Sequence, residues 1–170
     1  MYWRASGTGK STLAYELAKL YGVNVIEADD IGQALKASTT KDILPAIHSA
    51  ENWMNIRIEG NVNWLINVSK EMIPGLKAIV ERHIEDKLPV IIEGDFIYPE
   101  LTLSFNNPEI KCFYVIESDK NQIIQNYLAR EGSDSQNYRA EISIAYGEWI
   151  KNKCNEMGIK FIDQDHGIIF

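Results

Sequence analysis

The sequence predicts an α/β fold in which helices flank a mostly parallel sheet, and three observations support this prediction. Short runs rich in β-branched residues alternate with longer stretches of helical periodicity, as in chains of strand–helix units. A glycine-rich loop, "RASGTGKST" (residues 4–12), directly precedes the first helical stretch. Acidic residues follow two of the strand-like runs, where the carboxyl ends of parallel strands meet at one edge of a sheet.

Length and composition indicate one globular domain that spans residues 1–170. Hydrophobic residues make up 45% of the chain and charged residues 24%, which is ordinary for a folded domain. The net charge of −7 argues against nonspecific binding to nucleic acid or to an anionic membrane, but not against a small phosphorylated ligand. Without a signal-like start or an apolar run of membrane-spanning length, the cytoplasm is the expected location. Cys112 and Cys154 lack metal-site spacing and are expected to be buried, reduced thiols.

The first third of the chain is expected to form helix, strand and helix. Residues 11–21 are predicted to be a helix that ends at Gly22, with three leucines on one face: Leu13, Leu17 and Leu20. Residues 23–30 then predict a short buried strand that ends in two carboxylates, followed by a short helix over residues 31–36.

The middle of the chain is expected to be mostly helical. Residues 46–58 are apolar and ambiguous, and a helix is favoured there. Residues 61–87 have the longest helical periodicity in the sequence. Because Pro74 lies inside that stretch, we expect a kink or a break just before it. Residues 89–95 are predicted to be the second clear strand.

The last third is expected to add two strands and two helices. The strands are predicted over residues 110–118 and 159–163, and the helices over residues 120–130 and 141–157. The polar stretch "EGSDSQNYR" (residues 131–139) is expected to join the two helices.

The glycine-rich loop is predicted to bind phosphate. Gly9, Lys10 and Ser11 fit the pattern of a phosphate-binding loop, and Gly7 adds flexibility. Backbone N–H groups of such a turn suit phosphate oxygens, the Lys10 ammonium can bridge phosphates, and the Ser11 hydroxyl can ligate Mg²⁺. The alternative is a glycine-rich turn that only caps a helix.

Arg4 departs from the loop pattern, because it stands where such loops begin with glycine. Only three residues precede it, whereas a buried central strand needs about five or six. The first strand is therefore expected to be nearly missing. The sheet position left open would invite pairing with another chain, so a homo-oligomer is one expected outcome.

Acidic residues are predicted to face the loop. Asp29 can accept a hydroxyl proton or hold Mg²⁺ through water, whereas Asp30 is expected mainly to cap the following helix. Glu93 ends an apolar strand and is typical of a Walker B acid that acts on Mg²⁺ or on the attacking hydroxyl. Gly94 leaves room beside it, and Asp95 adds a carboxylate. The alternative for Glu93 is a solvated acid at a strand end.

Arg130 and Arg139 flank the polar stretch between the last two helices. Guanidinium groups on a closing lid would neutralise charge on a transferred phosphoryl group, and an ordinary solvated turn is the alternative. The histidines and three tryptophans show no site pattern and are expected to be surface or packing residues: His48, His83, His166, Trp53, Trp64 and Trp149.

These motifs resemble the opening of P-loop small-molecule kinases, most of all the 2-phosphoglycerate kinase-related group of AAA-type ATP-binding proteins. The resemblance is carried by "SGTGKSTLAYELAKLYGVNVIEADDI", by "PVIIEGDFIYPEL", and by "FYVIESD" with the paired arginines after it. It implies a nucleoside-kinase-like P-loop NTPase fold with a helical insertion and a lid, and it implies ATP and Mg²⁺ as cofactors. Carried onto matching positions, Asp29 and Glu93 would serve the acceptor and the metal, and Arg130 and Arg139 the lid. The ATP-binding positions would be Ser6, Gly7, Thr8, Gly9, Lys10, Ser11 and Thr12.

Two functions follow from this sequence, and they differ in whether chemistry takes place. The first is an ATP-dependent phosphotransferase that moves the γ-phosphoryl group to a small-molecule acceptor, with Lys10, Asp29, Glu93, Arg130 and Arg139 as the catalytic residues. The second is a catalytically impaired ATP-binding module that acts as a sensor or scaffold. Plain hydrolysis that drives a partner is disfavoured, and no pattern identifies the acceptor.

Overall fold

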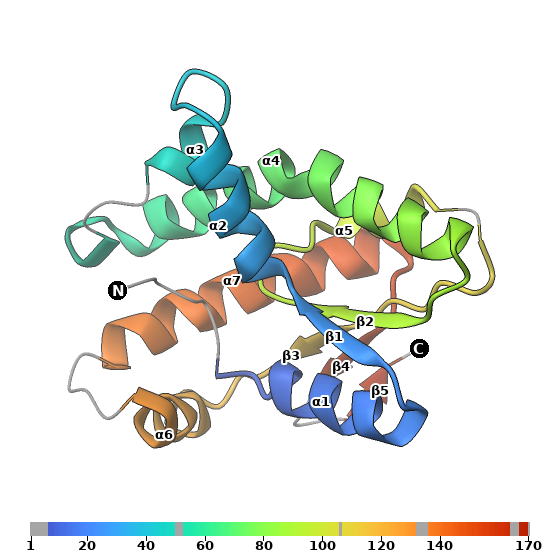
Figure 1. Cartoon of the computed structure of the whole chain (residues 1–170). Coiled ribbons are helices and arrows are strands. Elements are labelled where there is room, and N and C mark those ends of the chain that lie inside the picture. Colours follow the sequence, from blue (N-terminus) through green and yellow to red (C-terminus); the bar gives the residue numbers. More distant parts are fainter. Residues whose placement is uncertain (1–6, 50–52, 106, 132–135, 164–166, 170) are drawn as a thin grey trace. The chain divides into compact units, whose positions relative to one another are not determined.

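A computed structural model describes residues 7–49, 53–105, 107–131, 136–163 and 167–169 (Figure 1). The chain is α/β, with small sheets and mostly helices, as the sequence predicts. It divides into two compact units, and each is described by itself. The first contains Ser11–Asn55 and Asn63–Tyr98, and the second contains Met1–Lys10, Ile56–Val62 and Pro99–Phe170.

The first unit is built on two parallel strands, β1 (Asn24–Glu27) and β2 (Val90–Glu93). Their register pairs Asn24 with Val90 at one end and Glu27 with Glu93 at the other. Both strands therefore end together, and each ends in a glutamate. Figure 1 shows β1 and β2 side by side, with α2 continuing directly from β1.

Helix α1 (Lys10–Tyr21) forms where the sequence predicts it and ends before Gly22, whose φ of +65° suits glycine. The predicted leucine face is wrong in one respect, because Leu20 is 73% exposed. The buried positions of α1 are the small residues Ala14 and Ala18.

Helix α2 (Ala28–Ser38) begins three residues earlier than predicted, and this corrects the assignment of two acids. Asp29 and Asp30 lie in its first turn and do not end the strand. The N-cap position is Glu27, without a side-chain capping bond, so the predicted capping role of Asp30 is wrong. Tertiary packing accounts for the early start of the helix, because Ala28 is fully buried where the chain turns from β1 into α2.

Helix α4 (Ile58–Glu85) continues through Pro74, so the break expected at this proline is absent. Proline removes one backbone donor, but the turns around it are anchored by packing. Gly32 of α2 lies against the Met72 sulfur, and Gly75 lies against Leu35. The burial of Met72 and its neighbours stabilises the helix more than one lost hydrogen bond destabilises it.

The described residues of the stretch after α2 form α3 (Pro45–His48) and a 3₁₀ turn, η1 (Trp53–Asn55), so the helix favoured over residues 46–58 is found there only in part. The Glu71 carboxylate of α4 accepts the N–H groups of Ala46 at 2.8 Å and Ile47 at 2.9 Å. Trp64 donates its indole N–H to the Ala46 carbonyl at 2.9 Å and meets the Phe96 ring edge to face. Trp64 is thus a packing residue, as predicted.

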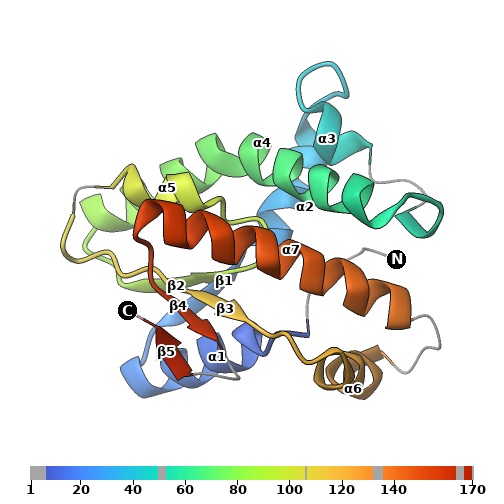
Figure 2. The ribbon, with the colours of Figure 1, turned by 180° about the vertical axis from the view of Figure 1, so that it is seen from behind.

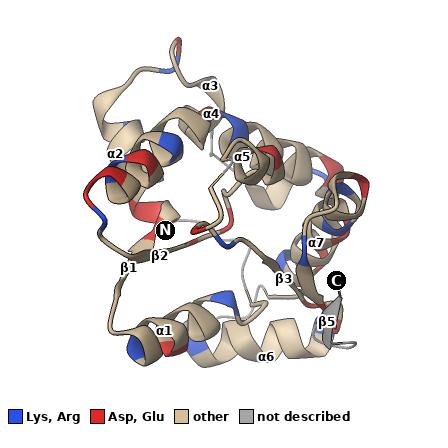
Figure 3. Cartoon of the chain, turned by 90° about the vertical axis from the view of Figure 1, so that its right-hand side faces the viewer, with Lys and Arg blue, Asp and Glu red and all other residues tan. Residues whose placement is uncertain are grey.

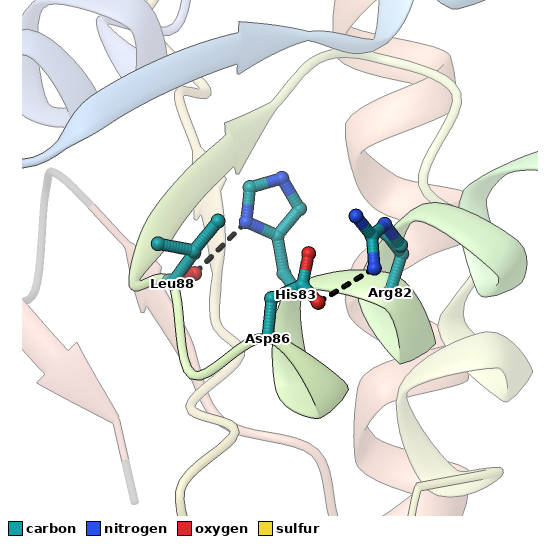
Figure 4. A network of polar contacts seen from close by, with 4 residues as sticks. All are labelled: Arg82, His83, Asp86 and Leu88. Carbon is teal, nitrogen blue, oxygen red and sulfur yellow. Dashed lines mark hydrogen bonds and ion pairs between the residues drawn. The ribbon is translucent and has the colours of Figure 1, made fainter.

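Polar contacts close the C-terminal end of α4, as Figure 4 shows. Arg82 Nη1 donates to Asp86 Oδ1 at 2.6 Å, and His83 Nδ1 lies 2.8 Å from the Leu88 carbonyl oxygen. Because a carbonyl only accepts, Nδ1 of His83 carries the proton in this contact. Lys87 adopts a φ of +54° in the turn between α4 and β2. The hydrogen bond from His83 to Leu88 spans this turn, so His83 is a structural residue there.

The second unit holds a three-stranded sheet of β3 (Tyr114–Ile116), β4 (Phe161–Asp163) and β5 (Gly167–Ile169), in that order (Figure 2). Strands β3 and β4 are parallel, and β5 pairs antiparallel with β4. The two predicted strands are confirmed in shorter form, whereas β5 was not predicted. The sheet predicted as mostly parallel therefore includes an antiparallel strand.

The helices of this unit are α5 (Pro99–Leu103), α6 (Lys120–Glu131) and α7 (Gln136–Met157). Helix α7 begins five residues before its predicted start and includes Arg139. A buried cluster joins α6 to α7, and its members are Ile123, Tyr127 and Ala140. Gly147 of α7 lies against Ile116 of β3, which brings the helix close to the sheet.

Both cysteines are free thiols, as predicted; Cys154 is buried as expected, whereas Cys112 is only half-buried. Burial raises the pKa of Cys112 to about 11 and that of Cys154 to about 12. Trp149 stacks on Tyr146 within α7, so it also packs. Within the described ranges, no helix combines the length and the apolar character that crossing a membrane requires.

Candidate functional site

The glycine-rich loop enters α1 through two glycines that adopt positive φ, +96° at Gly7 and +77° at Gly9. A Cβ at Gly7 would lie 2.9 Å from Cγ2 and 3.2 Å from the carbonyl oxygen of Ile123. Both backbone conformation and space therefore require glycine at this position. Lys10 is the first residue of α1, so the loop delivers the positive end of the helix dipole. Arg4, Ser6 and the nearly missing first strand lie outside the described residues.

The Ser11 hydroxyl, in the first turn of α1, contacts the end of β2. Its Oγ donates to the Glu93 carboxylate and lies 3.1 Å from each of the two oxygens. Glu93 is 9% exposed, so the carboxylate is held at a protected position. The structure thus brings together the two residues that the sequence singled out as metal ligands, although 82 positions separate them.

A second hydroxyl of α1 makes the matching contact at the end of β1. Tyr15 lies one turn after Ser11 and donates to Glu27 Oε1 at 2.7 Å. This hydrogen bond, with the charge of the Glu27 carboxylate, raises the pKa of Tyr15 above its ordinary value. Sequence reasoning missed Glu27 because the strand was expected to end at Asp30; the in-register pairing of Glu27 with Glu93 is its structural signal.

Gly94 allows β2 to end close to α2. Its φ is +153°, and a Cβ there would lie 2.6 Å from the Cβ of Ala28. Glycine at position 94 therefore makes room for Ala28 of α2, and the expectation that it leaves room beside Glu93 stays a prediction. Asp29 lies in the first turn of α2, and Asp95 comes two residues after the end of β2. Figure 3 shows acidic segments, in red, at the start of α2 and near β2. Asp29 is half-buried in the first turn of α2.

The two arginines predicted for a lid lie on helices and share one aromatic ring. The guanidinium carbon of Arg139 is 4.2 Å from the centroid of the Tyr127 ring, and that of Arg130 is 5.4 Å from it. Arg139 is 5% exposed, whereas Arg130 is exposed at the end of α6. The Tyr127 hydroxyl lies 2.9 Å from Ser143 Oγ. Sequence reasoning missed Tyr127, which looked like an ordinary residue of a helix.

Helix α6 also contacts the loop directly. Asn126 donates its side-chain N–H to the Gly7 carbonyl oxygen at 2.6 Å. Ile123, one turn earlier on α6, is the residue that lies against Gly7. No sequence signal marked either residue, because 119 positions separate Asn126 from Gly7.

The donor set fits a magnesium ion better than a fully protein-bound metal. Across the ranges that the structure describes, no group of three or more His, Cys, Asp or Glu side chains could hold an ion. Mg²⁺ needs few protein ligands, because it keeps several waters and binds through one or two carboxylates together with phosphate oxygens. The Ser11 hydroxyl and the Glu93 carboxylate supply oxygen ligands of that kind.

The predicted site residues are divided between the two units. The structure brings Ser11 and Glu93 together in the first unit, and Arg130 and Arg139 together around Tyr127 in the second. The other described members of the first unit are Thr12, which is exposed, and Asp29; those of the second are Gly7, Thr8, Gly9 and Lys10.

Curated relatives of this chain are archaeal proteins named 2-phosphoglycerate kinase. The protein of Methanopyrus kandleri is 26% identical over 178 residues, which cover 95% of this chain and 54% of the relative. The protein of Methanothermobacter thermautotrophicus is 27% identical over 129 residues, covering 69% of this chain and 42% of the relative. The protein of Pyrococcus horikoshii is 34% identical over 102 residues, covering 55% of this chain and 34% of the relative.

The similarity extends over nearly the whole chain for the Methanopyrus protein, over smaller parts of it for the other two, and over only part of each relative. The chain spans about half the length of the Methanopyrus protein and less of the other two. No protein-family model matches the sequence. No solved structure matches it either. The resemblance to 2-phosphoglycerate kinase-related proteins that the motifs predict is confirmed by these relatives.

Proposed function

We propose that this chain is an ATP-dependent phosphotransferase that moves the γ-phosphoryl group of ATP to a small-molecule acceptor. The contact between the Ser11 hydroxyl and both oxygens of Glu93 carries the proposal. In P-loop enzymes a loop Ser or Thr and a carboxylate at the end of a neighbouring strand hold Mg²⁺. The relatives named 2-phosphoglycerate kinase support a kinase rather than another nucleotide-binding function.

The loop residues would bind the phosphates. The positive φ of Gly7 and Gly9 turns the backbone sharply just before α1, which suits N–H groups that converge on phosphate oxygens. Lys10 would bind the β- and γ-phosphates through its ammonium group, and Thr8, Thr12 and Ser6 would complete the nucleotide contacts.

Ser11 and Glu93 would hold Mg²⁺, which when bound neutralises charge that develops on the phosphate oxygens. Because the Ser11 hydroxyl already donates to Glu93, the two oxygen ligands are held near each other before any ion binds. This arrangement reduces the reorganisation that binding requires.

Asp29 would orient the hydroxyl of the acceptor, and Arg130 and Arg139 would stabilise negative charge on the transferred group. Their common contact with the Tyr127 ring supports treating the two arginines as a pair. The names of the relatives make 2-phosphoglycerate the first acceptor to test.

The test is ATP consumption with Mg²⁺ and 2-phosphoglycerate, followed by a panel of other phosphorylated and hydroxylated metabolites. Lys10→Ala and Glu93→Gln should each lower turnover by at least about 100-fold, since they remove charge stabilisation of the transition state. Lys19→Ala is the matched control, because Lys19 is an exposed lysine in the last turn of the same helix.

The outcomes separate the two functions that the sequence suggested. Turnover that is lost in Lys10→Ala and kept in Lys19→Ala supports the phosphotransferase. Wild-type binding of Mg·ATP without turnover on any acceptor supports the impaired ATP-binding module. Turnover that survives Lys10→Ala contradicts the proposed role of the loop.

A further inference from the structure

We propose that Asn126 is a positioning residue that sets the orientation of the Gly7–Thr8 peptide in the phosphate-binding loop. This inference rests on the proposed function, because it assigns a task to the loop when ATP binds. It concerns a side chain of α6 that belongs to neither the loop nor the predicted lid.

The hydrogen bond from Asn126 to Gly7 is short, and helix α6 fixes the side from which it approaches. Asn126 Nδ2 lies 2.6 Å from the Gly7 carbonyl oxygen, and Gly7 is buried. Ile123, three residues before Asn126 on the same helix, is fully buried, and its side chain and carbonyl lie where a Gly7 side chain would be. Helix α6 therefore contacts Gly7 through packing and through a hydrogen bond from one face.

The Asn126 amide is itself held in one orientation. Its Oδ1 accepts from Gln122 Nε2 at 2.9 Å, one turn earlier on the helix. Because the Gly7 carbonyl can only accept, the NH₂ group must face Gly7, and the amide oxygen is then the atom that faces Gln122. The Gln122–Asn126 pair thus directs a donor at the loop.

Holding this carbonyl also directs the N–H of the next residue. The Gly7 carbonyl and the Thr8 N–H belong to the same peptide unit, which is planar and trans. In such a unit the C=O and N–H bonds point in opposite directions. A hydrogen bond to the Gly7 oxygen therefore restrains the Thr8 N–H to the side away from Asn126.

This constraint matters because Gly7, with its positive φ, is a conformationally permissive residue. Glycine visits several backbone conformations at little cost, so a loop with glycines at positions 7 and 9 loses entropy when it orders around a phosphate. A side chain that orders the peptide in advance lowers that cost and so strengthens phosphate binding.

The test compares Asn126→Ala and Asn126→Asp with wild type and with the control Gln125→Ala, an exposed change at the adjacent position of α6. The Asp variant keeps the size of the side chain and can still accept from Gln122, but it turns an acceptor toward the Gly7 carbonyl. Calorimetry with Mg·ATP measures the Kd of each variant. Amide NMR spectra follow the Thr8 N–H resonance, and urea unfolding without nucleotide measures folding.

We expect Asn126→Ala to raise the Kd for Mg·ATP by about threefold to tenfold, and Asn126→Asp to raise it further. The Thr8 amide resonance should shift in both variants before ATP is added, and Gln125→Ala should leave Kd and resonance unchanged. An Ala variant that does not fold shifts the test to the isosteric Asp variant.

Three results would overturn the inference. If wild type binds Mg·ATP and both Asn126 variants bind within twofold of it, the positioning role is wrong while the proposed function stands. An unchanged Thr8 resonance in both variants excludes control of this peptide. If wild type does not bind Mg·ATP, the proposed function fails first and the inference fails with it.

Discussion

Replacing Lys151 with methionine should destabilise the protein through a carboxylate in the second unit rather than through lost packing. Lys151 of α7 binds Asp163 at the end of β4, with 2.9 Å between Nζ and Oδ2. The Asp163 side chain is 2% exposed and that of Lys151 is 28% exposed. Methionine keeps most of the aliphatic stem, so the change removes chiefly the positive charge that Lys151 places 2.9 Å from Asp163.

The expected magnitude follows from this burial. Removal of one partner from a fully buried ion pair costs about 3–5 kcal/mol, because the other charge stays buried. Since Lys151 is partly reached by water, we reduce the expected loss to about 2–3 kcal/mol. For a chain of this size, each kcal/mol shifts the melting temperature by about 2–4 °C, so Lys151→Met should melt about 4–12 °C below wild type.

The assay is urea unfolding and thermal melting of Lys151→Met beside Lys153→Met. Lys153 binds Glu156 at 2.7 Å, but that glutamate side chain is 61% exposed, so its loss should cost under about 1 kcal/mol. Adding Asp163→Asn to Lys151→Met should recover part of the stability, since it removes the buried charge. Equal losses in the two single variants would refute the reasoning from burial.

The remaining predictions concern two glycines and two thiols. Gly94→Ala should lower the free energy of unfolding by about 2–4 kcal/mol, because the new Cβ would lie 2.6 Å from that of Ala28. Gly22→Ala meets open space and should lower it by only about 1 kcal/mol, because of the positive φ. Urea unfolding measures both variants, and similar losses in the two would contradict the clash at Gly94. Cys112, with a pKa raised to about 11, should react with a disulfide reagent at pH 8 about 100-fold more slowly than a model thiol, and Cys154 more slowly still. Both thiols bind protons more tightly when folded, so their contribution to stability is complete below about pH 9 and is lost as the pH rises through 11 and 12. Urea midpoints that do not fall over this range, or that fall equally in a Cys112→Ala/Cys154→Ala variant, would contradict that sign.

Local signals allowed the sequence to predict the elements beside the site. The glycine-rich loop and Gly22 mark both ends of α1, and the run before Glu93 is apolar and β-branched as a buried strand should be. These features depend on neighbouring residues alone, so a single sequence contains them. The proposed roles of Lys10, Ser11 and Glu93 come from the same local patterns.

Tertiary contacts explain the errors. Ala28 and the two acids after it continue a strand-like run, but the close approach of Gly94 to Ala28 accompanies a turn into α2 directly after Glu27. Pro74 is tolerated in α4 because distant residues bury the same helix. Neither effect is visible in a window of a few residues.

The residues that sequence reasoning missed share one property, which is a partner far along the chain. Asn126 donates a hydrogen bond to the Gly7 carbonyl oxygen, and Glu27 pairs with Glu93 in the neighbouring strand. The Tyr127 ring contacts the guanidinium groups of two arginines. Arg130 is close to it in sequence, whereas Arg139 lies in a stretch that was expected to be a polar connection. Contacts of this kind are specified by the fold and have no spacing rule of their own.

The two hydroxyl contacts of α1 have a consequence for redesign of this helix. An insertion of one residue between Ser11 and Tyr15 would rotate the second hydroxyl by about 100° around the helix axis and remove it from Glu27. Changes beyond Tyr15 leave both attachments intact, and the helix there ends in the exposed Leu20 and Tyr21. Labels and substitutions should therefore leave residues 11–15 and the buried Ala18 unchanged and use the exposed positions Leu20 and Tyr21.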